Sequence, residues 1–219
     1  MKKKNILMMA LSLVLVAVIA VGATLAYFTD KTDAKQNVFT TGNVAIEIVD
    51  ETNGPTEGDT WQADTSRDDG IDYTHVMPGD TISKEVGVTI GADSEDCWVA
   101  LKLDIAATPD QAYTEADALT AEQAVAAVQA LVDKQLEGNA NWKAEEGIYY
   151  YQSTLSASDA AKAACTLFEG LEIPTEWGNP YANIQFSITV QAAAVQAANV
   201  ADAAAAQPEL AKLFVEAQN

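Results

Sequence analysis

Histidine is almost missing from this chain, since His75 is the only one among 219 residues. A zinc site of the H-E-x-x-H type needs two histidines, and Ser-His-Asp or Cys-His catalysis would depend entirely on His75. The sequence also lacks a glycine-rich loop that could cradle a phosphate group. We therefore predict no catalytic residues and no required cofactor, and we expect that the protein is not an enzyme.

Basic residues are also scarce, with 12 Lys and Arg against 32 Asp and Glu. Three of them, Lys2, Lys3 and Lys4, stand at the N-terminus, so the remaining chain carries nine and has a formal charge of −23. Such a surface repels nucleic acid and anionic lipid headgroups. Nucleic acid is therefore excluded as a partner, whereas cations could screen or bridge neighbouring copies.

One long apolar run is present, from Ile6 to Val21. The lysines before it and the small residues of Thr24-Leu25-Ala26 after it complete the pattern of a secretory signal peptide. We expect residues 1–26 to be removed, so that the mature chain begins at Tyr27. The alternative is an uncleaved anchor, because the run approaches the roughly 20 residues that span a bilayer. In both cases the rest of the chain lies outside the cell, and only an uncleaved leader would contact a membrane.

Only two cysteines occur, Cys97 and Cys165. An even number in an exported chain allows one disulfide across a separation of 68 residues. By the loop-entropy model such a bridge would stabilise the fold by about 4 kcal/mol. The alternative is two buried free thiols that pack as small hydrophobic groups.

Alternating apolar and polar residues predict antiparallel strands with one solvated face. In the first of them, Val44, Ile46 and Ile48 are expected to point inward, whereas Lys84 interrupts the inward face of a later one. Many short strands with Gly and Pro turns favour a β-sandwich. The expected strand segments are Val38–Val49, Ile71–Val76, Thr81–Ile90, Cys97–Ile105, Gly147–Tyr151, Thr166–Phe168, Leu171–Pro174 and Asn183–Val195.

Two helices interrupt or follow these strands. Thr120 and Gln123 have the spacing of a capping box, and helical apolar spacing follows until Gly138, which predicts an inserted helix within 119–137. The tail 200–219 carries a short apolar stripe, with Pro208 expected in the first turn of a helix. That helix either packs on its own domain, which we favour, or contacts a neighbouring subunit.

Four different short motifs are found along the chain, and the first of them lies in the leader. They are Gly22-Ala23-Thr24-Leu25-Ala26-Tyr27-Phe28-Thr29-Asp30, Asn37-Val38-Phe39-Thr40-Thr41-Gly42-Asn43, Met77-Pro78-Gly79-Asp80-Thr81 and the stretch Ile188–Asn199. In these motifs the chain resembles the camelysin/TasA-like family of secreted Gram-positive proteins, whose leader is cut by a SipW-type signal peptidase. The resemblance implies an antiparallel jelly-roll sandwich, here spanning 38–199, after a signal peptide and a mature N-terminal arm, 27–37.

The resemblance also implies a function, because TasA-like proteins form extracellular matrix fibres by passing an N-terminal strand to the next subunit. On this basis the candidate donor strand includes Tyr27, Phe28, Val38 and Phe39. A strand that completes the open edge of another copy's sheet produces a filament when the contact repeats head to tail. We therefore expect a secreted, self-assembling structural subunit of a biofilm matrix or cell-surface fibre.

Two other functions stay open at this point. The first is a monomeric cell-surface binding module that uses Trp61 and the acidic segment Asp50–Gly70. The second is a camelysin-like peptidase, which a single histidine hardly supports. The acidic segment Asp64–Asp72 does not match an EF-hand. If Gly70 is the turn glycine at the sixth position, the loop begins at Thr65 and its twelfth residue is Val76 instead of glutamate. An irregular surface calcium site remains an alternative.

The junction after Ala26 is directly testable. We expect the protein recovered from outside the cell to begin at Tyr27, as N-terminal sequencing or intact-mass measurement would show. Replacing Ala26 with a bulky residue should block processing, because the cleavage site requires small side chains. An extracellular form that still begins with the three lysines would contradict cleavage and favour the anchor.

Overall fold

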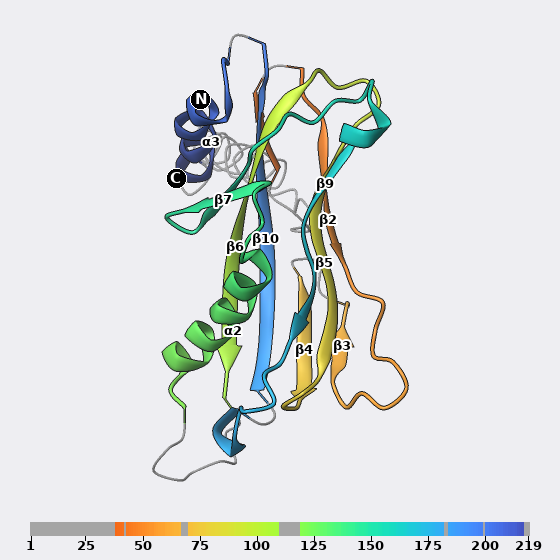
Figure 1. The fold of residues 1–219 in the computed structure, drawn as a ribbon, viewed down its shortest axis with the longest axis vertical. Helices are drawn as coiled ribbons and strands as arrows, with labels where there is room; N and C mark the ends of the chain where they lie inside the picture. Colours follow the sequence, from red (N-terminus) through yellow and green to blue (C-terminus); the bar gives the residue numbers. More distant parts are fainter. Residues whose placement is uncertain are drawn as a thin grey trace, which may run out of the picture. The chain divides into compact units, whose positions relative to one another are not determined.

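The computed structural model describes residues 38–41, 43–66, 70–109, 119–181, 184–198 and 200–216. Backbone contacts divide the chain into two units, Met1–Ala34 and Lys35–Asn219, and every described element belongs to the second. That unit is mainly β and is built from two sheets (Figure 1). The predicted signal peptide 1–26 and the whole of the arm 27–37 lie outside the described residues.

The larger sheet has seven strands and is organised around its longest strand, β10 (Ile184–Gln196). β10 pairs antiparallel with β6 (Cys97–Thr108) along almost its whole length. All other pairs in this sheet are antiparallel as well, except that β1 lies parallel to β10. The remaining strands are β1 (Val38–Thr41), β3 (Gln62–Asp64), β4 (Ile71–Val76), β7 (Trp142–Glu145) and β8 (Ile148–Tyr151).

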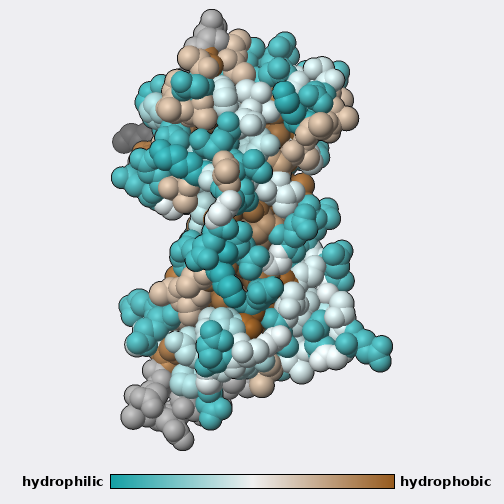
Figure 2. Space-filling view, viewed as in Figure 1, coloured by the Kyte–Doolittle hydropathy of each residue, from teal (hydrophilic) through white to brown (hydrophobic). Residues whose placement is uncertain are grey.

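The smaller sheet has the order β2-β5-β9 and is fully antiparallel. Its strands are β2 (Ile46–Glu51), β5 (Thr81–Ile90) and β9 (Ala164–Glu172), and short 3₁₀ turns occupy Ala160–Lys162 and Asn179–Tyr181. The chain passes repeatedly from one sheet to the other, so that a single core contains inward residues of both. This is a sandwich, as the alternation predicted. Polar residues cover much of the surface in the view of Figure 2, and hydrophobic residues are visible near its middle.

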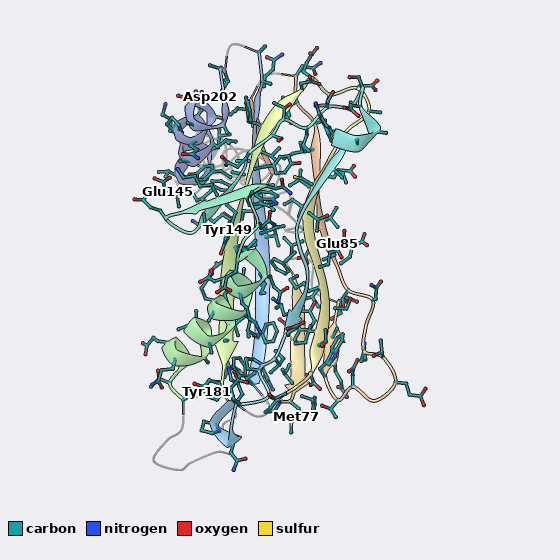
Figure 3. All side chains as sticks on the ribbon, viewed as in Figure 1. Met77, Glu85, Glu145, Tyr149, Tyr181 and Asp202 are labelled. Carbon is teal, nitrogen blue, oxygen red and sulfur yellow. The ribbon has the colours of Figure 1, made fainter. Side chains whose placement is uncertain are left out.

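The inserted helix α2 (Ala121–Leu136) packs against this core. Thr120 Oγ1 accepts a hydrogen bond from the Gln123 N–H, and Gln123 Oε1 accepts one from the Thr120 N–H, so the predicted capping box is confirmed. The buried face of α2 contacts β6 and β9, and Gln129 donates to the Tyr149 hydroxyl of β8 at 2.9 Å (Figure 3). Its buried residues are Ala124, Val128, Leu131 and Val132.

The tail forms helix α3 (Ala203–Glu216), which packs on its own domain. Leu210 and Phe214 are buried in a second apolar cluster with Ala193 and Val195 of β10, as we favoured. The expected position of Pro208 is wrong, because the helix begins at Ala203 and Pro208 lies inside it. The helix begins earlier because Asp202 accepts a hydrogen bond from the Ala205 N–H, which satisfies a free donor of the first turn.

Two strand predictions require correction, and the short strands β3 and β7 were not predicted. Val38–Val49 is not one strand, because Val38–Thr41 joins the large sheet whereas Ile46–Glu51 joins the small one. Val44, Ile46 and Ile48 are nevertheless buried, as expected. The two pieces expected on either side of Gly170 form one strand, β9, because the ladder to β5 absorbs the irregular positions as bulges.

Gly87 marks the tightest of these positions. It lies where the β5–β9 register shifts, and a Cβ added there would come within 2.6 Å of the Cys165 carbonyl oxygen. We expect Gly87→Ala to destabilise the fold by about 1–3 kcal/mol, because a backbone group cannot move aside as a flexible side chain can. Chemical denaturation of wild type and variant measures this difference.

Gly178→Ala is the matched control. Its added Cβ would have Pro180 Cδ as nearest neighbour at 3.7 Å, an ordinary van der Waals contact. This variant should unfold at nearly the wild-type denaturant concentration. Equal destabilisation by both substitutions would contradict a steric role for Gly87.

Candidate functional site

The two edges of β10 are filled in different ways. One edge pairs with β6 continuously, from Gln185 with Thr108 to Gln196 with Cys97. The other edge pairs with β4 over Ile184–Ile188 and with β1 over Ala192–Val195. The second edge is therefore completed by two short strands from distant parts of the chain, and one of them is the first described segment of the protein.

The β1 strand is the weaker of these two partners. It consists of four residues, and its ladder places Val38 beside Ala192 and Thr41 beside Val195. Parallel pairing is slightly less stable per residue than antiparallel pairing, and a strand this short contributes few backbone hydrogen bonds. We infer that β1 can leave β10 at a lower free-energy cost than any of the long antiparallel strands.

The β10 segment that receives β1 is made of small, deeply buried residues. Ala192 and Ala194 belong to the core between the sheets, whereas Ala193 and Val195 belong to the cluster beneath α3. Backbone contacts also place α3 beside β1. If β1 left, backbone N–H and C=O groups of Ala192–Val195 would lose their hydrogen-bond partners. Unpaired backbone groups in a buried position cost free energy, so another strand would be favoured there.

Of the predicted donor-strand residues, Val38 and Phe39 lie in β1, where their backbones pair with Ala192 and Ala193 of the same chain. Tyr27 and Phe28 lie outside the described residues, as does the predicted cleavage site between Ala26 and Tyr27. The motif stretch Ile188–Asn199 contains Ala192–Val195, the residues that pair with β1. The sequence thus pointed to both partners of this ladder without indicating that they pair.

The two cysteines come from different sheets and are buried in the same core. Cys97 lies on β6 and Cys165 on β9, and both are buried free thiols in the structure. Burial is the main cause that raises the pKa of each to about 12, with a smaller contribution from nearby charge at Asp96 for Cys97. Neither thiol is therefore a ready nucleophile near neutral pH. The disulfide between them stays a prediction.

His75 lies at an irregularity of the β4–β10 ladder. Thr74 and His75 together oppose Gln185, and His75 adopts a positive φ of 57°. An extra residue in one strand of an antiparallel pair is a β-bulge, which turns the local side chains. His75 is exposed, and its Nδ1 lies 3.2 Å from the Thr74 hydroxyl. The bulge therefore explains the unusual backbone conformation of His75.

Trp61, which the binding-module alternative places on the contact surface, is buried instead. Its side chain is only 1% exposed and contacts Tyr73 with ring centroids 5.9 Å apart. The reason is that β3 follows at once and pairs with β4, which draws the preceding tryptophan into the core. A binding surface on Asp50–Gly70 would therefore lack its aromatic residue.

The acidic segment near Gly70 is only partly described, because Arg67, Asp68 and Asp69 lie outside the described residues. Asp64 and Asp72 lie opposite each other in the β3–β4 ladder. Among the residues that the structure describes, no three or more His, Cys, Asp or Glu side chains are grouped so that they could hold a metal ion. The surface calcium site stays an untested alternative.

Sequence reasoning missed one polar pair in the core. Lys84 interrupts an apolar face as noted, but it points inward and is 0% exposed, and its ammonium group forms a salt bridge with Asp50 of β2. Burial lowers the pKa of Lys84, and the neighbouring Asp50 charge partly opposes this. Strand periodicity could have indicated the inward direction, since Ile82 and Val86 on either side are buried.

No helix within the described part of the chain is long and apolar enough to cross a membrane. Comparisons with protein-family models, curated proteins and solved structures found no match to this chain. The likeness to the camelysin/TasA-like family therefore remains a resemblance of the quoted motifs. What the structure contributes is the pairing of two of those motifs along one strand edge.

The raised pKa of both buried thiols predicts that the free energy of unfolding decreases in alkaline solution. The unfolded chain releases these protons near the ordinary pKa of 9.0, whereas the folded protein holds them until about pH 12. Their contribution is therefore complete below pH 9 and is lost as the pH rises. We expect the melting temperature to fall between about pH 9 and about pH 12, and less so in a Cys97→Ala/Cys165→Ala variant.

Circular dichroism melts at several pH values measure both slopes. The double variant is the control for the tyrosines, which also titrate in this range. Identical slopes for wild type and variant would contradict free thiols and favour the disulfide.

Proposed function

We propose that this chain is a secreted structural subunit that assembles into extracellular fibres by exchanging its N-terminal strand. The observation that carries the proposal is the ladder between β1 and Ala192–Val195 of β10. In a single copy the protein fills this position with its own β1. In a fibre, the N-terminal strand of one copy would fill the position on the next.

Three features support the proposal. The exchanged strand is the first described segment, so it can extend toward another copy without disturbing the remaining strands. The receiving position lies between the core and α3, so a docked strand is covered on both faces. The leader pattern and the resemblance to camelysin/TasA-like proteins point to the outside of the cell and to the same assembly mode.

In this proposal a SipW-type peptidase releases the arm at Tyr27, and the mature protein lies in the biofilm matrix or on the cell surface. The sandwich is jelly-roll-like, which the repeated passage of the chain between the two sheets supports. The protein is not an enzyme, in keeping with the raised pKa of both thiols and the position of His75 on a bulge.

The test uses the known register. Phe39 and Ala193 are direct partners, so Phe39→Cys with Ala193→Cys can form a disulfide across the ladder. Oxidising the purified monomer should lock β1 in its own chain and abolish fibres, as electron microscopy would show. The same sample should assemble after reduction, because the strand is then free to exchange.

Fibres formed under reducing conditions and then oxidised provide the second measurement. Exchange places the two cysteines on different copies, so a denaturing gel without reductant should show a ladder of covalent multimers. Wild type treated identically is the control for reductant effects. Fibres that yield only monomers on such a gel would rule out exchange of β1.

A further inference from the structure

The Lys84–Asp50 pair lies in an environment where ions are rarely found. The Lys84 side chain is 0% exposed and that of Asp50 is 8% exposed. Lys84 stands between the buried residues Ile82 and Val86 on the inward face of β5, whereas Glu85 projects from the opposite face (Figure 3). Taking two charges out of water costs free energy that their attraction often does not recover.

The geometry around the pair is tightly held. Asp50 pairs with Val86 in the β2–β5 ladder, so Lys84 is its diagonal neighbour, within reach of a long side chain. Beyond the ladder, Thr52 Oγ1 donates to the Ser83 carbonyl at 2.7 Å. Tyr73 of the other sheet covers the ammonium group, with Lys84 Nζ 6.0 Å from its ring centroid. The amine and the carboxyl group therefore have little freedom to separate.

We propose that Lys84 and Asp50 form an intramolecular amide bond that joins β5 covalently to β2. The bond links Lys84 Nζ to Asp50 Cγ and releases one molecule of water. The proposal does not depend on fibre assembly, because both groups lie in one chain and one sheet.

The reaction requires no cofactor or oxidant. A proton passes from the Lys84 ammonium group to the Asp50 carboxylate, which gives a neutral amine and a neutral carboxylic acid. The Nζ lone pair then attacks Cγ. The resulting tetrahedral carbon expels its hydroxyl group, which takes a proton from Nζ and leaves as water. The product is a neutral amide, and the oxidation state of every atom is unchanged.

Two properties of the site favour this reaction. Burial favours the neutral amine, which is the nucleophilic form, and this agrees with the lowered pKa of Lys84. Two groups held in reactive contact behave as if present at effective molarities of about 10⁵–10⁸ M. The amide also replaces two buried charges by one uncharged group, which removes the cost of burying the ions.

Two other lysine–carboxylate pairs among the described residues provide internal controls. Lys143 and Glu145 are 2.8 Å apart, but their side chains are 51% and 54% exposed. Lys212 and Glu209 are also 2.8 Å apart, and these side chains are 60% and 54% exposed. Both of these pairs are open to water, so close contact alone should not join them.

Intact-mass measurement of the purified full chain tests the proposal. We expect a mass lower by one water molecule than the sequence requires, after any leader removal is taken into account. Proteolysis should release a branched peptide that contains both Asp50 and Lys84. A full mass, or an unmodified Lys84 peptide, overturns the proposal without reference to any variant. A water lost elsewhere, such as at Asp69-Gly70, would leave that peptide unmodified.

Two variants and a control sharpen the result. Lys84→Met keeps the length of the side chain, removes the amine and should restore the full mass. Asp50→Asn retains an electrophilic carbonyl carbon, so it should lose ammonia instead of water. Lys143→Met removes an exposed pair and should keep the deficit of one water molecule. A deficit that persists in Lys84→Met would overturn the assignment.

Discussion

The antiparallel ladder between β10 and β6 is the interaction on which the rest of the sandwich depends. It runs through twelve paired positions, from Gln185 with Thr108 to Gln196 with Cys97. β8 adds to the free edge of β6, and β4 and β1 share the free edge of β10. Because side chains alternate between faces, this one register also decides which residues enter the core and which meet α3.

The same ladder explains why the N-terminal strand has a special position. A central strand with one edge fully paired still requires partners along the other edge, and β4 supplies them only as far as Ile188. The small residues Ala192, Ala193 and Ala194 leave the next part of the edge as a narrow, well-covered position. A short parallel strand completes it at modest energetic gain. A closed monomer and an exchanging subunit are thus compatible with one architecture.

Local patterns predicted much of this fold. Ile71–Val76 and Thr81–Ile90 were predicted with their observed bounds, and the capping box at Thr120 was predicted with both of its hydrogen bonds. Such features depend on residues close in the chain. The failures have the opposite origin. Trp61 is buried because β3 pairs with β4, and Val38–Val49 divides because its halves join different sheets. These outcomes depend on distant partners, which periodicity does not identify.

The sequence by itself determined the leader pattern, the acidic composition, the single histidine, and the positions of both helices and most strands. Each follows from composition or from spacing within a few residues. Only the tertiary structure decided that Val38–Thr41 pairs with Ala192–Val195, and that Lys84 meets Asp50 inside the sandwich. The physical reason is that backbone pairing is common to all strands. Register and burial, which depend on the whole core, select the partners.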